Sequence, residues 1–198
     1  MPIALTYDEV KALDPCKDDF PRVVKLLGGK TGWNSHKIDA AAARRAGCTL
    51  DDIVWVASKL ACKDAGIERR LRLWRADCAA HVLHLYERTG KSEAPRNAII
   101  AARQFARGEI DEDERTSACA AAGAATWGVA QNAAWGAACA ASWVALGPAQ
   151  NTAKYAQNAA GSACDAEETW QFDRLIAWLS DDEPEDWPLP ECAIKEVA

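Results

Sequence analysis

The sequence predicts an all-α fold, a multi-helix bundle built around a helical hairpin rich in alanine, glycine and tryptophan. Helix-capping residues recur along the 198-residue chain with little strand signal between them. One long segment repeats its apolar residues at the helical period. Half of the residues from 118 to 145 are alanine, the strongest helix former. These observations together favour packed helices over any sheet.

The N-terminal part predicts short helices. Thr6 and Glu9 form a capping-box pattern, which opens a helix up to about residue 13. Acids and a proline open a segment over residues 22–27, and the glycine pair that follows ends it. Residues 30–36 are predicted to form a loop.

The next elements are longer. Residues 37–46 are predicted to be helical and to end at a glycine, after which Thr49 opens a helix that ends near Gly66. Residues 67–89 form the clearest amphipathic helix. Its apolar stripe consists of Ile67, Leu71, Trp74, Cys78, Val82 and Leu85.

The C-terminal half contains the hairpin. After a helix that ends at Gly108, the alanine-rich region from residue 116 is interrupted by three glycines. Each interior glycine costs about 1 kcal/mol relative to alanine, so these helices need close neighbours, and small residues allow neighbouring backbones to approach. Helices are also predicted up to residue 160 and over residues 165–179, followed by an extended, proline-containing tail. We therefore divide the chain into an N-terminal helical subdomain (1–66), a main bundle (67–180) and an acidic tail (181–198).

Composition narrows the classes of partner, compartment and metal site that the sequence allows. A net charge of −6 argues against direct binding to nucleic acid and favours a basic partner. No apolar run is long enough to span a membrane, and the N-terminus lacks the order of a signal peptide, so we expect a cytoplasmic protein. The eight cysteines contain no CxxC pair, which gives no support to a zinc or redox site. We predict no metal and no cofactor.

One cluster of polar side chains lies on the predicted helix 67–89, formed by Arg70, Asp77, His81 and His84. We interpret it as a structural network at the edge of the core, in which Asp77 holds His81 in one tautomer. Asp77, His81 and His84 at these spacings could instead form part of a metal-dependent enzyme site. The sequence contains no GxSxG or HExxH signature, and we predict that the protein is not an enzyme.

A second candidate site is the acidic run near the C-terminus. An acidic segment beside an aromatic residue can bind a basic protein surface, although such segments can also serve solubility alone. The predicted partner-binding residues are Asp181, Asp182, Glu183, Glu185, Asp186 and Trp187. Nine tryptophans are many for a core of this size, so a homodimer through tryptophan or small-residue helix faces is a further prediction.

Several runs resemble a known family. The run Leu73-Trp74-Arg75-Ala76-Asp77-Cys78-Ala79-Ala80-His81, the segment Pro95-Arg96-Asn97-Ala98-Ile99 and the run Ala106-Arg107-Gly108-Glu109 are similar to Imm5-like immunity proteins of bacteria, prophages and phages. The segment Asp14-Pro15-Cys16 and the run Asp51-Asp52-Ile53-Val54-Trp55 resemble the N-terminal portion of the same group. The resemblance implies a helical protein that neutralises a toxin or defence factor by binding it.

We therefore expect a non-catalytic inhibitor that binds a toxin, nuclease or defence effector. A phage or mobile-element anti-defence protein, such as an anti-CRISPR that blocks a nucleic-acid-binding complex, is one alternative. A metal-dependent enzyme and a purely structural adaptor are the others.

Overall fold

The computed structural model describes residues 3–88, 92–125, 133–146, 149–180 and 183–191. Helices dominate these ranges, so the all-α prediction is confirmed. The N-terminal unit contains β1 (Ala4–Leu5), α1 (Tyr7–Lys11), α2 (Phe20–Leu26), α3 (Gly29–Asn34), β2 (Ile38–Asp39) and α4 (Ala40–Arg45). The bundle contains α5 (Leu50–Ala61), α6 (Ala65–Glu87), α7 (Ala94–Arg107), α8 (Glu112–Ala125), α9 (Ala133–Leu146), α10 (Ala149–Ala160), the 3-10 turn η2 (Gly161–Ala163) and α11 (Cys164–Leu179).

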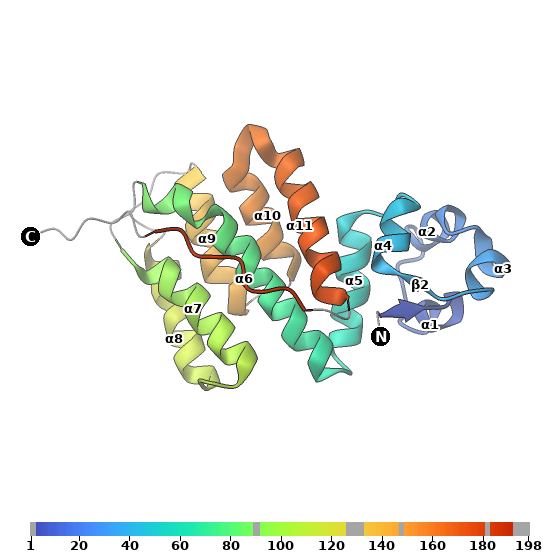
Figure 1. Cartoon of the computed structure of the whole chain (residues 1–198), viewed down its shortest axis with the longest axis horizontal. Coiled ribbons are helices and arrows are strands. Elements are labelled where there is room, and N and C mark those ends of the chain that lie inside the picture. The colour runs from blue at the N-terminus through green and yellow to red at the C-terminus, as the bar shows by residue number, and fades with distance from the viewer. Residues whose placement is uncertain (1–2, 89–91, 126–132, 147–148, 181–182, 192–198) are drawn as a thin grey trace, which may run out of the picture.

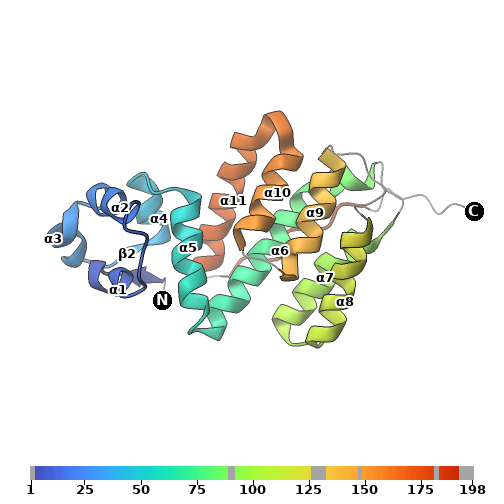
Figure 2. The same cartoon turned by 180° about the vertical axis from the view of Figure 1, so that it is seen from behind.

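Helix α6 runs through the middle of the bundle, with α5, α7, α9, α10 and α11 packed around it (Figures 1 and 2). The N-terminal unit lies at one end of the molecule and the α7–α8 pair lies toward the other (Figure 1). The alanine-rich helices α8 and α9 pack against each other, and α9 also contacts α6 and α10; the predicted turn between them lies outside the described residues.

Burial on several faces of α6 explains its central position. Trp74 and Cys78 of the predicted apolar stripe have no exposed surface, and neither do Ala76 and Ala79 outside it. Alanines let adjacent helices approach closely, while the indole fills the space between them. Each fully buried large apolar side chain contributes about 1.5–3 kcal/mol, so this helix is a main source of the stability of the bundle.

The contact between α9 and α10 depends on a glycine. A Cβ atom built at Gly136 would lie 3.0 Å from the backbone nitrogen of Ala159 and 3.1 Å from its Cα. Backbone atoms cannot swing aside as a flexible side chain can, so the close approach of the two helices requires glycine here. The interior glycine is thus offset by tight packing, as the sequence predicts for this region.

Three local predictions differ from the structure. Residues 30–36 are not a loop, because α3 covers most of them; Trp33 is buried and its indole donates to the Leu5 carbonyl at 2.9 Å. The helix predicted from residue 37 begins only at Ala40, since Asp39 is its N-cap and accepts from the Ala42 amide. The helix that follows Thr49 ends at Ala61, before the predicted Gly66.

The larger of two buried apolar clusters in the described part of the chain extends from Val10 in the N-terminal unit to Leu179 at the end of α11. The division at residues 66 and 180 stays a prediction. Among the described helices, none is long and apolar enough to cross a membrane. Trp127 and Gly128 of the alanine-rich region lie outside the described residues.

Candidate functional site

The acidic C-terminal segment lies against the body of the protein. We call residues 183–191 the strap; it has no regular secondary structure. In Figure 1 it crosses the face of α6 between α7 and α11. It carries Glu183, Glu185, Asp186 and Trp187 of the predicted partner-binding set, whereas Asp181 and Asp182 lie outside the described residues.

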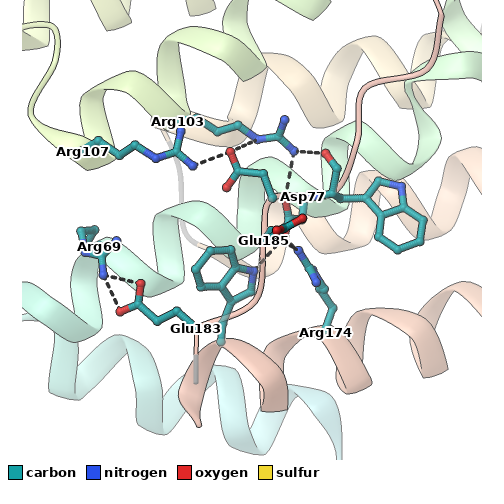
Figure 3. A network of polar contacts seen from close by, with 10 residues as sticks. Arg69, Asp77, Arg103, Arg107, Arg174, Glu183 and Glu185 are labelled. Carbon is teal, nitrogen blue, oxygen red and sulfur yellow. Dashed lines mark hydrogen bonds and ion pairs between the residues drawn. The ribbon is translucent and has the colours of Figure 1, made fainter. Parts of the chain in front are cut away.

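Arginines from the helices hold the acidic side chains of the strap (Figure 3). Glu183 accepts from Arg69 and from Arg70 Nε, the latter at 3.0 Å. Asp186 accepts from Arg107, and Arg103 Nε lies 3.5 Å from the same oxygen. The guanidinium of Arg69 holds the pKa of Glu183 below its ordinary value, with Arg70 adding to the effect. These two carboxylates are therefore largely balanced by charge within the same molecule.

Further arginines bind strap carbonyl groups. Arg174 donates to the Glu185 carbonyl, and Arg103 Nη2 donates to the Trp187 carbonyl at 2.6 Å. Arg96 donates to the Pro190 carbonyl and is itself fixed by the buried carboxylate of Glu87, at 2.7 and 2.9 Å. Extended backbone has no internal hydrogen bonds, so these donors satisfy groups that would otherwise need water.

Asp77, on the α6 face that the strap crosses, binds the strap through its buried carboxylate. It has no exposed surface, and its two carboxylate oxygens each accept two hydrogen bonds. Oδ1 accepts from Arg103 Nη2 at 2.9 Å and from the backbone amide of Trp187 at 2.8 Å. Oδ2 accepts from Arg174 Nε at 2.7 Å and from the Trp178 indole at 2.8 Å. One carboxylate thus joins α6, α7, α11 and the strap, and its full set of donors offsets the cost of burying a charge.

The histidines of the predicted polar network lie nearby but have other partners. His81 Nδ1 lies 2.7 Å from Oε2 of the buried Glu167, so Glu167, and not Asp77 as we expected, orients this ring. The ring stacks on Trp170 with centroids 3.8 Å apart and meets the edge of Trp187 at 5.2 Å. The Asp77 oxygens are already occupied by the four donors, which is the physical reason for this difference.

Arg70 and His84 complete the residues predicted on α6. Arg70 also donates to the Ser180 carbonyl at 3.0 Å, where the chain leaves α11. His84 is exposed and its Nδ1 contacts the His81 carbonyl at 3.1 Å. Within the described parts of the chain, no group of three or more His, Cys, Asp or Glu side chains could hold a metal ion. Burial raises the pKa of the Cys78 thiol well above its ordinary value, so this cysteine stays protonated.

The arginines on α7 and α11 were missed in the sequence. Arg96, Arg103 and Arg107 are seven and four residues apart, which places them within about 40° on one face of a helix. That stripe is a signal for an anionic or carbonyl-rich partner segment, and the acidic tail was one candidate in the chain. Arg174 and Trp178 carry no comparable pattern.

Comparison with known proteins places the bundle in a family. Residues 65–177 match the family described as "Imm-5 like putative immunity protein". No curated protein and no solved structure matches the chain. The matched region begins with α6 and runs almost to the end of α11, so it contains Asp77 and the arginines that hold the strap, while the strap itself lies outside it. Because the match spans more than half of the 198 residues, the chain belongs to the Imm-5 like immunity protein family.

Proposed function

We propose that this protein binds another protein, a toxin, and neutralises it by occupying its surface without chemical turnover. The observation that carries the proposal is the family match over residues 65–177, from α6 almost to the end of α11. An immunity-like role implies a protein partner.

The state of the reactive side chains supports a binding role over catalysis. Each carboxylate oxygen of Asp77 already accepts two hydrogen bonds from the protein. His81 is stacked on Trp170 and paired with Glu167. The Cys78 thiol is buried and protonated. A general base or nucleophile must reach the substrate, whereas these side chains are buried, hydrogen-bonded or stacked within the protein.

We place part of the binding face on the strap. Arg69, Arg70 and Arg107 offset the charges of Glu183 and Asp186, which leaves the exposed carboxylates of Glu185 and Glu191 to face a partner. A segment that is already fixed loses little conformational entropy on binding, so each contact contributes more to affinity. The expected partner has a basic surface, in keeping with the net charge of −6.

The test begins with capture on the immobilised full chain and identification of the bound protein by mass spectrometry. The purified partner is then titrated with this protein while its toxic activity is measured. The toxic activity of the partner should fall linearly with added protein and vanish at one chain of this protein per partner molecule. If light scattering shows that this protein is a dimer, one dimer should neutralise two partner molecules. Loss of partner activity at far less than one equivalent of this protein would contradict the binding mechanism. Capture of a component of a defence complex instead of a toxin would assign this protein an anti-defence role.

A charge reversal tests the position of the face. Glu185→Lys should weaken binding about tenfold or more, because it places a cation against a basic surface. Asp113→Lys is the matched control, since Asp113 is also an exposed acid but lies on α8. Equal effects of the two variants would show that only the overall charge matters and would remove the strap from the binding face.

A further inference from the structure

An apolar pocket lies where the N-terminal unit meets the bundle. Its volume is about 540 Å³, and its walls come from every element of the N-terminal unit on one side and from α5, α10 and the end of α11 on the other. Aromatic and aliphatic side chains line it, among them Phe20, Val23, Trp33, Trp55, Val56 and Leu179. This volume falls in the range of about 300–1,000 Å³ that is typical of pockets that bury a small molecule.

Acidic residues surround this apolar lining. Asp19, Asp39, Asp51 and Asp52 line the pocket, with Lys154 as the lysine among its lining residues. Asp52 is paired with Arg22 at 2.7 Å, and Asp39 caps α4. Asp19 and Asp51 are exposed, and within the described residues their carboxylates accept no hydrogen bond. The charge left at the pocket is therefore negative.

The pocket wall ends close to the start of the strap. Leu179 forms part of the pocket wall, and Glu183 follows it by four residues. Arg70 binds both the Ser180 carbonyl and Glu183, so the exit of the chain from the pocket wall and the start of the strap are fixed by one side chain. A single partner surface can therefore contact both.

We propose that this pocket receives an apolar side-chain cluster of the protein partner that is flanked by lysine or arginine residues. The inference rests on the proposed function and names the anchor of the same interface. Protein interfaces concentrate their binding energy in apolar or aromatic anchors that fill such pockets, while charges at the rim select the partner. The negative rim requires basic flanks.

The experiment uses the full chain and two synthetic peptides. Each contains phenylalanine and two leucines; one is flanked on both sides by two lysines and the other by two glutamates. We expect the lysine-flanked peptide to shift the NMR signals of the pocket residues, including the Trp33 and Trp55 indoles, and to bind at least tenfold more tightly than the glutamate-flanked one. Equal binding of the two peptides, no binding, or shifts confined to the strap would overturn the proposal, as would equal binding of neutral decyl maltoside at the same residues.

Variants locate the contact. Val56→Phe fills part of the pocket from a half-buried position and should abolish peptide binding. Should that variant fold poorly, Asp51→Asn is an exposed change that should weaken binding about two- to fivefold. Asp113→Asn is its control, because both acids lie in the first turn of a helix. An Asp51→Asn affinity equal to that of the control would contradict the charged rim.

Two results separate this inference from the proposed function. One-to-one neutralisation of a captured partner that survives Val56→Phe unchanged would remove the pocket and leave the binding role intact. Peptide binding at the pocket without any stoichiometric partner would remove the binding role. Glu185→Lys should leave peptide affinity within twofold of the wild type, because the strap carboxylate is not part of the pocket.

Discussion

Replacing Asp77 with asparagine tests whether the strap belongs to the folded core. The carboxylate is fully buried and accepts four hydrogen bonds, two on each oxygen. Asparagine keeps the shape but converts one acceptor into an NH2 group, which faces two donors whichever way the amide is turned. The change also removes the negative charge between the guanidinium groups of Arg103 and Arg174.

The structure sets the size of the effect. Removing one partner of a buried ion pair costs about 3–5 kcal/mol. Four separate hydrogen bonds to a charged group, at about 1.5–3 kcal/mol each, would sum to more, but bonds within one network are not additive. We therefore expect Asp77→Asn to lower the free energy of unfolding by about 3–5 kcal/mol, a large part of the ~5–15 kcal/mol typical of a domain.

Urea unfolding measures the loss, and hydrogen exchange of the Trp187 amide reports on the strap, because that amide donates to Asp77 Oδ1. Asp173→Asn is the control: its carboxylate is 66% exposed and paired with Arg44, so the expected change is about 1 kcal/mol or less. A loss below about 1 kcal/mol for Asp77→Asn, with the Trp187 amide still protected, would refute the assignment of Asp77 as the anchor.

Two further predictions concern packing and pH. Gly136→Ala should destabilise the fold by about 1–3 kcal/mol, because the new Cβ would meet the Ala159 backbone. Gly123→Ala is the control: its Cβ would meet its nearest atom at 3.9 Å, so it should stabilise the fold by up to ~1 kcal/mol. Thermal unfolding that ranks the two variants in the opposite order would contradict the α9–α10 contact. Glu183 has a folded pKa below its ordinary value of 4.5, so its contribution to stability is complete above about pH 4.5 and is lost as the pH falls through the folded pKa. The difference in unfolding free energy between wild type and Glu183→Gln should therefore be present at pH 6 and shrink as the pH falls below 4.5; a difference that stays constant through this titration would refute the ion pair.

Local signals in the sequence predicted most of the helices. Thr6 with Glu9, and Thr49 with Asp52, form capping boxes at the starts of α1 and α5. The predicted helix 67–89 corresponds to α6, shifted by two residues at each end. Capping and helical periodicity depend on residues a few positions apart, so one sequence is enough to detect them.

Contacts between distant residues could not be predicted in this way. Residues 30–34 of the expected loop belong to α3, where the Trp33 indole donates to the Leu5 carbonyl, 28 positions away. The strap is a stronger case, since its contacts with Asp77 and Arg69 span 110 and 114 positions. The acidic run and the arginine stripe of α7 were both visible in the sequence, but nothing local indicated that they would pair or that α6 and α11 would supply further counter-charges.

The strap determines the sign of the charge on the face that it covers. Without it, the arginines at positions 69, 70, 103, 107 and 174 would lie around a single buried carboxylate, and the face would be basic. With it, Glu183 and Asp186 offset those cations, and the exposed carboxylate of Glu185 is added on the outside. A partner that is selected by charge therefore meets the strap and not the helices beneath it. Because Asp77 fixes the strap through the Trp187 amide, the same buried residue that stabilises the bundle also determines which charges the partner encounters.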